Sequence, residues 1–147
     1  MADYVVADTT VISHLTKASR DSDAYVHTMG PRRLAVSFQT PAELLAADFG
    51  EARRQRVDDL LAGTLRLPHS EATDVWYARV AGRRRELRKG AQSGSDASDA
   101  DMWIISSALE HRLPLFSHDR QQVYLGRAMG LKVFTNLDSL KDDNPDL

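Results

Sequence analysis

Short apolar runs with the composition of β-strands alternate with helical patterns along this chain, and that alternation restricts the fold more than any other feature. Apolar residues recur every three or four positions between the runs, as they do in amphipathic helices. Strands that alternate with helices over short connections form a parallel sheet with helices on both faces. The sequence therefore predicts a three-layer α/β/α sandwich around a central, mostly parallel sheet of about five strands. The runs are Tyr4–Ala7, Leu34–Phe38, Leu65–Leu67, Pro114–Ser117 and Leu131–Phe134.

Local signals set the expected ends of the helices. Thr40 is expected to be an N-cap, with Pro41 at the first helical position and Glu43 at the third. Asp101 is expected to start an apolar helix, and Gly130 is suited to end the helix before the last strand. Helices are expected over residues 11–15, 40–50, 51–62, 70–89, 101–111 and 120–129, with a surface loop over residues 90–100.

The chain has the size of one domain. Its 147 residues contain no internal repeat and no linker that would divide them. We therefore expect a single domain over residues 1–140 and a frayed, acidic tail over residues 141–147. The sequence has no cysteine, no basic amino-terminal region and no apolar run long enough to span a membrane. These features predict a cytoplasmic protein without a membrane contact.

The overall charge is slightly negative, which by itself argues against a broadly basic, nucleic-acid-binding surface. The formal net charge is −2 and the sequence pI is about 6.2. Acidic residues gathered at one site would, however, lower the net charge while a local basic stripe still met phosphates. One expected helix ends in such a stripe, and either RNA phosphates or a solvated helical face with Glu86 as a partner explains it. The stripe consists of Arg79, Arg83, Arg84, Arg85, Arg88 and Lys89.

Acidic side chains follow the expected strands or begin the helices on the same side of the sheet. Asp8 follows the first strand, Asp119 follows the fourth, and Glu43 and Asp101 lie in first turns of helices. Ligands of open parallel sheets bind at this carboxyl edge. Clustered carboxylates repel one another and stay ionised only beside a cation, and all-oxygen ligands suit Mg²⁺ or Mn²⁺. Such an ion activates water and neutralises charge on a phosphate, so the pattern indicates phosphodiester hydrolysis.

Each acid also has a purely structural explanation. A capping box with Thr40 would account for Glu43, and helix capping would account for Asp101 and Asp119. An Asx-turn would account for Asp8. The functional interpretation therefore depends on the four acids taken together.

Four segments resemble the motifs of PIN domains, in the same order and with similar spacing. The resemblance extends over about residues 4–135, and within the family it is closest to the VapC toxins of bacterial toxin–antitoxin pairs. Each motif is weak by itself, but four in order make the resemblance specific. The segments are Val5–Ile12, Ser37–Leu44, Asp101–Ala108 and Leu115–Arg120.

The resemblance implies a five-stranded parallel sheet and an endoribonuclease that cleaves RNA with metal-activated water. It assigns the catalytic and metal-binding roles, for Mg²⁺ or Mn²⁺, to Asp8, Glu43, Asp101 and Asp119. Asp99 lies two residues before Asp101 and is a candidate additional ligand, so which of the two faces the metal is left open. A VapC-like protein would also form a homodimer and bind a cognate antitoxin that blocks the acidic site.

Three further residues near the acids are candidates for substrate binding. Thr9 and Thr10 follow Asp8, and Thr10 stands where PIN domains usually have Asn or Ser. His118 precedes Asp119 and is either a contact to the scissile phosphate or an exposed loop histidine. Arg83 and Arg84 of the basic stripe complete the predicted RNA-binding set.

Two other functions compete with the nuclease. In a catalytically silent PIN-like module that binds RNA or protein, the acids would persist only as caps. In a phosphatase that forms an aspartyl phosphate, Asp8 would be the nucleophile, but such enzymes usually place a second Asp two residues later, where this chain has Thr10. The presence of all four acids favours the nuclease. The sequence does not indicate which RNA would be cut.

Overall fold

The computed structural model describes residues 3–17 and 20–146, and within them the five predicted strands form one sheet. All neighbouring strands are parallel, and their order is β3-β2-β1-β4-β5. This arrangement confirms the predicted α/β class. Residues 1–2, 18–19 and 147 of the predicted domain and tail lie outside the described residues. The strands are β1 (Tyr4–Ala7), β2 (Arg33–Val36), β3 (Leu65–Arg66), β4 (Leu115–Phe116) and β5 (Val133–Phe134).

Six of the helices match predicted ones, whereas α2 and the short 3-10 helix η1 were not predicted. Among the α2 side chains that the structure describes, Tyr25 alone is buried and Met29 is partly buried one turn later, so the apolar stripe of this helix is too narrow to stand out. α3 ends earlier than expected, and α6 begins at Asp99 rather than Asp101 because Ser98 is its N-cap. The helices are α1 (Thr9–Leu15), α2 (Arg20–Met29), α3 (Thr40–Ala46), α4 (Glu51–Ala62), α5 (Glu71–Lys89), α6 (Asp99–His111), α7 (Arg120–Ala128) and the 3-10 helix η1 (Lys141–Asp143).

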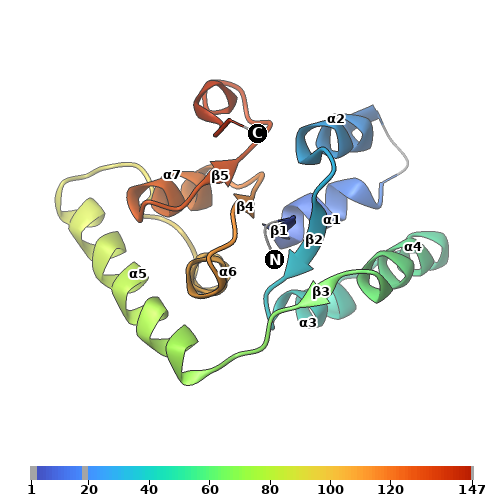
Figure 1. The fold of residues 1–147 in the computed structure, drawn as a ribbon, viewed down its shortest axis with the longest axis horizontal. Coiled ribbons are helices and arrows are strands. Elements are labelled where there is room, and N and C mark those ends of the chain that lie inside the picture. Colours follow the sequence, from blue (N-terminus) through green and yellow to red (C-terminus); the bar gives the residue numbers. More distant parts are fainter. Residues whose placement is uncertain (1–2, 18–19, 147) are drawn as a thin grey trace.

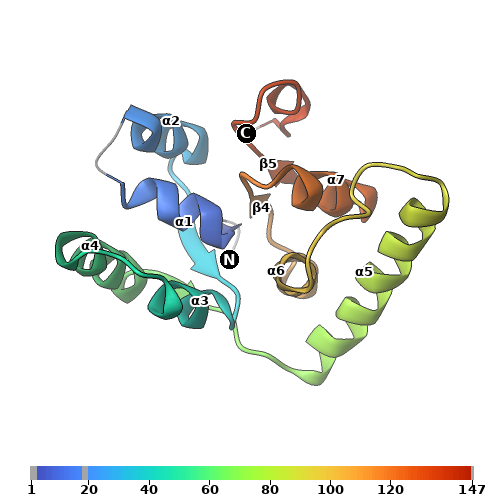
Figure 2. The same ribbon diagram turned by 180° about the vertical axis from the view of Figure 1, so that it is seen from behind.

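Alternation along the strands sends side chains into two separate cores, one on each face of the sheet. Val5 and Ala7 pack with α1 to α4, whereas Val6 between them packs with α5, α6 and α7. Figure 1 shows the same division, with α1 to α4 on one side of the strands and α5 to α7 on the other, and Figure 2 shows it from behind. The molecule is therefore the three-layer sandwich that the sequence predicts.

The order of the strands reverses between β1 and β4. The chain leaves β1 toward β2 and β3 on one side, then crosses the opposite face to reach β4 and β5 on the other. The register pairs Ala7 with Phe116, and the Asp8 N–H donates to the Phe116 carbonyl at 3.0 Å. The residues that directly follow these two strands, Asp8 and Ser117, are consequently neighbours at the switch point.

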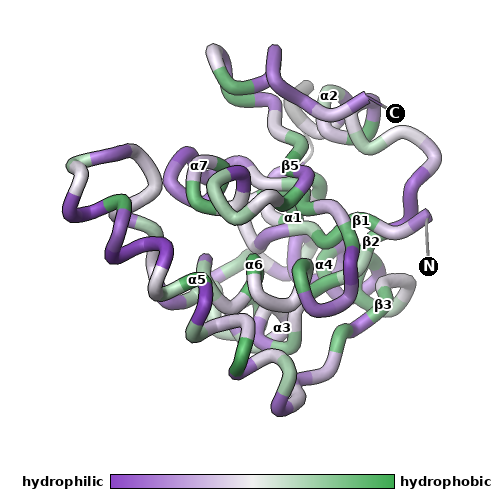
Figure 3. Tube along the Cα trace, turned by 60° about the vertical axis from the view of Figure 1, so that its left-hand side comes forward, coloured by the Kyte–Doolittle hydropathy of each residue, from purple (hydrophilic) through white to green (hydrophobic). Residues whose placement is uncertain are grey.

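α5 is the outermost helix of the molecule and packs on α6 and α7 (Figures 1 and 2). Its first turn is held to the end of α6, where the Ser70 and Thr73 hydroxyls each donate to the Glu110 carboxylate at 2.5 Å. Further along, Tyr77 stacks on Trp103 with ring centroids 4.0 Å apart. The second half of α5 carries the basic stripe and is strongly hydrophilic in Figure 3.

The carboxy-terminal segment, which we expected to fray, includes η1 and a polar contact to β5. The Asn144 side chain accepts a bond from the Thr135 N–H and donates to the Thr135 carbonyl, both at 2.9 Å. The Arg127 guanidinium also donates to Asn144, at 3.3 Å. Among the described residues, none of the helices combines the length and the apolar character that crossing a membrane requires.

Candidate active site at the carboxyl edge of the sheet

Asp8 is a buried carboxylate at the switch point, with 2% of its surface exposed. It is the N-cap of α1, and one carboxylate oxygen accepts from the Val11 N–H and the Thr10 hydroxyl, both at 2.7 Å. The other oxygen accepts from the Ser117 hydroxyl at 2.7 Å and the His118 N–H at 3.3 Å. Burial raises the pKa of Asp8 above its ordinary value, and these four hydrogen bonds oppose that rise.

Asp119 and Asp101 reach the same edge from the starts of α7 and α6. Asp119 is the N-cap of α7 and accepts from the Gln122 N–H at 3.0 Å. Asp101 closes a capping box with Ser98, accepting from the Ser98 N–H at 2.9 Å. Each of these bonds uses one oxygen of the carboxylate. The second oxygen of each acid accepts no hydrogen bond from the residues that the structure describes.

The electrostatics of Asp101 show that three acids share one environment. Burial raises the pKa of Asp101, the negative charges of Asp119 and Asp8 add to the rise, and bonds from Ser98 oppose it, so that the pKa reaches about 6. No basic side chain among the described residues forms an ion pair with any of the three acids. The edge therefore carries an excess of negative charge that a cation would relieve.

Glu43 joins the edge from α3, and it does so without the capping box we expected. The N-cap of α3 is Gln39, not Thr40, so that prediction is wrong. The Glu43 carboxylate instead accepts from the Thr9 hydroxyl and from the Gln39 amide, both at 2.9 Å. Because Thr9 directly follows Asp8, these bonds link Glu43 to the switch point.

Asp99 and the two predicted RNA-binding arginines have partners on the α5 side of α6. Asp99 accepts from the Tyr77 hydroxyl at 3.3 Å and lies 3.6 Å from an Arg84 nitrogen. Arg84 also donates to the Ala97 carbonyl at 2.9 Å, which holds the loop before α6. Arg83 pairs with Glu86 at 2.8 Å. Within the described part of the chain, neither arginine contacts Asp8, Glu43, Asp101 or Asp119.

Two hollows flank the acids, and the predicted substrate-binding residues line them. Thr9 and Thr10 line one of about 290 Å³ between α1 and α3, together with Phe49. His118 lines the other, of about 210 Å³, with His14 and Tyr25. The His118 ring bonds the Tyr25 hydroxyl through Nδ1 and packs edge-on against His14, with centroids 4.7 Å apart. His118 is thus held in place rather than being a free loop histidine.

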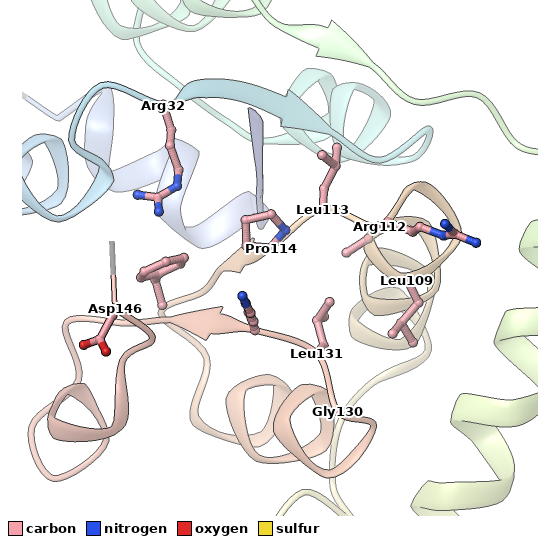
Figure 4. Close-up of a pocket in the computed structure, with 11 residues that line it drawn as sticks. Arg32, Leu109, Arg112, Leu113, Pro114, Gly130, Leu131 and Asp146 are labelled. Atoms are coloured by element: carbon pink, nitrogen blue, oxygen red, sulfur yellow. The ribbon is translucent and has the colours of Figure 1, made fainter. Parts of the chain in front are cut away.

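A third hollow, of about 420 Å³, lies at the opposite, amino-terminal edge of the sheet and contains none of the predicted site residues. Apolar residues such as Leu113 and Leu131 line much of it. Figure 4 shows Arg32 and Asp146 at one end of this hollow and Arg112 at the other. Its volume exceeds those of the hollows beside the acids, but it lacks a cluster of carboxylates.

The acids fit a divalent cation in their chemistry but are not arranged around one point. Within the described residues, no group of three or more Asp, Glu, His or Cys side chains is placed to hold a metal ion as it stands. The ligand types are nevertheless those of Mg²⁺ and Mn²⁺. Beside the acids, the buried side-chain oxygens of Gln39 and Gln122 also have no hydrogen-bond donor among the described residues.

Three residues that no sequence motif singles out contact the acids, namely Ser117, Gln39 and Gln122. Ser117 donates to Asp8 and accepts from the Asp119 N–H at 3.0 Å, so it connects two acids. Only the register of β1 and β4 reveals its place beside Asp8. The glutamines lie at the starts of α3 and α7, where a side-chain amide has no recognisable spacing.

The protein is a three-layer α/β domain with a parallel sheet and with acids at its switch point. Domains of this class bind their ligands at that point. The model of the PIN domain matches residues 5–127 of the sequence. This chain belongs to the PIN-domain family. A comparison with curated proteins finds no match.

Several solved structures share the fold. A chain of VapBC2 from Rickettsia felis, crystallised with a DNA fragment from the promoter, matches with 15% identity and a TM-score of 0.65, covering 90% of this chain and 98% of that chain. VapBC-1 from nontypeable Haemophilus influenzae matches with 22% identity and a TM-score of 0.64, and the match covers 90% of this chain and 97% of that chain. VapBC-5 from Mycobacterium tuberculosis is a member of the VapBC family of toxin–antitoxin systems. It matches with 26% identity and a TM-score of 0.59, and the match covers 90% of this chain and 97% of that chain.

Proposed function

We propose that this protein is a divalent-metal-dependent endoribonuclease and the toxin of a toxin–antitoxin pair. The observation that carries the proposal is that Asp8, Asp101 and Asp119 lie at the starts of α1, α6 and α7 on the carboxyl edge of the sheet, where the charges of Asp119 and Asp8 add to the raised pKa of Asp101. Membership of the PIN-domain family and the likeness to VapBC structures support it. RNA is the proposed substrate.

Mg²⁺ or Mn²⁺ would be held by Asp8, Asp101 and Asp119, with Glu43 beside them and Asp99 as an additional candidate. When bound, such an ion makes a water molecule nucleophilic and neutralises charge on the phosphate. The unused carboxylate oxygens of Asp101 and Asp119 are available without breaking their caps. Asp8 is different, because four donors already fill about the four acceptor positions of a carboxylate.

The chain's own residues would place the RNA. The side chain of Thr10 is exposed, and its hydroxyl is the donor on Asp8 that can most easily turn toward a ligand. His118, whose ring bonds the Tyr25 hydroxyl and whose backbone N–H donates to Asp8, is the candidate contact to a phosphate. Thr9 holds Glu43 in place. The basic stripe of α5, which includes Arg83, would supply positive charge to phosphates of the RNA farther from the acids.

The proposed partners follow from the VapBC likeness. We expect a cognate antitoxin to cover the acidic edge, a homodimer in solution and a cytoplasmic location. Light scattering after size-exclusion chromatography would measure the dimer, and co-purification with the product of a neighbouring gene would identify the antitoxin. Neither result is needed for the nuclease activity itself.

A cleavage assay tests the nuclease directly. Purified protein is incubated with an unpaired RNA oligonucleotide and with folded transfer RNA, in Mg²⁺, in Mn²⁺ and in EDTA. Cleavage is expected only with an ion, and an Asp8→Asn variant should lose it. Asp58→Asn, an exposed change on α4, is the matched control and should cut normally. Equal cleavage by the Asp8→Asn variant would reveal a contaminating nuclease.

A catalytically silent PIN-like binding module is the second candidate. One observation favours it: every one of the four acids has a structural partner, and no preformed metal cluster exists among the described residues. A protein that binds RNA equally well with and without EDTA, and never cuts it, would support this module instead.

A further inference from the structure

The side chains of two glutamines donate hydrogen bonds to consecutive backbone carbonyl groups in the first turn of α6. The side-chain amide of Gln39, at the start of α3, donates to the Ala100 carbonyl at 2.9 Å. The side-chain amide of Gln122, in the first turn of α7, donates to the Asp101 carbonyl at 3.3 Å. The turn that carries the Asp101 carboxylate is therefore held from two different helices.

Each glutamine also contacts another of the acids. The amide of Gln39 donates to a Glu43 oxygen at 2.9 Å, and the backbone N–H of Gln122 donates to Asp119 at 3.0 Å. Gln39 thus connects Glu43 with α6, and Gln122 connects Asp119 with α6. The two residues join three acids that come from three separate helices.

These contacts determine the orientation of both side-chain amides. That orientation leaves the amide oxygens without a hydrogen-bond donor from the part of the chain that the structure describes. Turning either amide over would point its oxygen at a backbone carbonyl oxygen, which cannot donate a hydrogen bond. In the observed orientation, the side-chain oxygens of Gln39 and Gln122 are buried without a donor among the described residues. Such atoms are costly and call for an explanation.

Packing alone does not explain Gln122. Its side chain is fully buried, with 0% of its surface exposed, on a helix whose other buried residues include Val123 and Leu125. An apolar side chain of similar size would fill the same space without leaving an oxygen unsatisfied. The polar group is therefore better explained by what it holds in place.

We infer that Gln39 and Gln122 are positioning residues that set Asp101 in register with Glu43 and Asp119 for binding a divalent cation. This inference rests on the proposed function. Neither glutamine binds the cation itself. Each acts through the backbone of α6, and partners that orient metal ligands in this way typically change metal affinity by about 10- to 100-fold when removed.

The test measures Mn²⁺ binding and thermal stability together, in wild type and in Gln39→Met and Gln122→Met variants. Mn²⁺ affinity, measured by electron paramagnetic resonance without RNA, should fall about 10-fold or more in each variant. The melting temperature of Gln122→Met should stay the same or rise, because the variant removes a buried oxygen that lacks a donor. A purely structural role of Gln122 predicts a lower melting temperature with unchanged Mn²⁺ affinity.

Gln121→Met is the matched control, since Gln121 is the adjacent residue of α7. Its side-chain oxygen accepts from the Gly94 N–H at 2.9 Å and the Asp96 N–H at 3.2 Å and holds the loop, not the acids. This variant should melt at a lower temperature and bind Mn²⁺ like wild type.

Three results would overturn the inference. Wild-type Mn²⁺ affinity in both Gln39→Met and Gln122→Met would remove it while leaving the nuclease proposal intact. Equal loss of affinity in Gln121→Met would show that general loosening of α7 is enough. If wild type itself binds no Mn²⁺, the inference fails together with the metal site, and RNA cleavage by wild type then decides whether the nuclease survives.

Discussion

The two edges of the sheet carry opposite charges and differ in shape. The carboxyl edge carries Asp8, Asp101 and Asp119, and two modest hollows lie near Asp8, lined by Thr9 and Thr10 and by His118. The amino-terminal edge has the larger hollow, about 420 Å³, and its charged lining is mostly basic, with Arg32 and Arg112 among its residues (Figure 4). The chemistry expected of a nuclease therefore lies where the protein is less hollow.

Helix direction explains this separation. In a parallel α/β fold the helices begin at the carboxyl edge, where free N–H groups favour anions, and end at the other edge, where free carbonyls favour cations. Asp8 and Asp119 are both N-caps. Arg112 directly follows α6, and Arg32 follows α2 and donates to the Met29 carbonyl at 3.4 Å. Helix capping alone would place acidic residues at one edge of the sheet and basic residues at the other. Activity measurements are therefore needed to show which edge takes part in catalysis.

The largest effect is expected from paired changes at the two edges. Asp8→Asn should reduce RNA cleavage roughly 1,000-fold, which corresponds to losing several kcal/mol of metal-derived stabilisation. Lys132 also lines the basic hollow, and Lys132→Gln should leave the rate within about twofold of wild type if that edge plays no part. Single-turnover cleavage rates provide the measurement. Similar losses in both variants would show that the active site has been assigned to the wrong edge.

Ser117→Ala should have the next largest effect, because it removes the hydroxyl that connects Asp8 and Asp119. Cleavage should fall about 10-fold and the free energy of unfolding should drop by about 1–2 kcal/mol, since two buried hydrogen bonds are lost. Urea denaturation and initial rates measure the two effects. Ser106→Ala is the control, because among the described residues the buried Ser106 hydroxyl bonds to the Met102 carbonyl of its own helix alone, at 2.6 Å. An equal loss of activity there would contradict a specific role for Ser117.

A pH effect of moderate size is expected from Asp101. Its pKa is raised to about 6 in the folded protein, from 3.8, so protonated Asp101 favours folding and this contribution is lost as pH rises from about 4 through 6. Asp101→Asn should therefore be more stable than wild type in EDTA at pH 7.5, by about 1 kcal/mol after allowance for solvent screening. Below about pH 4 the two proteins should be equally stable. A difference independent of pH, measured by urea denaturation, would exclude this origin.

The smallest effect is expected at the basic edge. Arg112 ends α6 with φ of 55°, a left-handed conformation that glycine adopts without steric cost. Arg112→Gly should raise the free energy of unfolding by about 0.5 kcal/mol and leave cleavage unchanged. Thermal melting and the cleavage assay check the two parts. A clear loss of cleavage would give the basic edge a role in the reaction.

The sequence predicted the layers and the strand pattern because apolar periodicity reports burial directly. Tyr4–Ala7 alternates between two cores, and the short strands β4 and β5 lie inside longer apolar runs that end in turns. α2 escaped prediction because Tyr25 is its only buried side chain among those described. Short apolar stripes of this kind carry too little signal to separate a helix from a loop.

The site could be predicted only as a set of acids on one edge. Side-chain periodicity places Asp8 and Asp119 after neighbouring strands, but it cannot show which oxygen accepts from which donor. The Thr40 capping box failed because the chain was already helical at Gln39. Ser117 and Gln122 depend on contacts across more than one element, and those contacts exist only once the strands are in register.

The capping role of the acids has a consequence for how the protein matures. The N–H groups of Val11, Ser98 and Gln122 each donate to one oxygen of Asp8, Asp101 and Asp119 respectively. These amides partly compensate the charge during folding, so the chain does not need an ion as a template. Under the proposed function, synthesis and metal loading would then be separate events, and a newly made copy would reach its final shape before it becomes active.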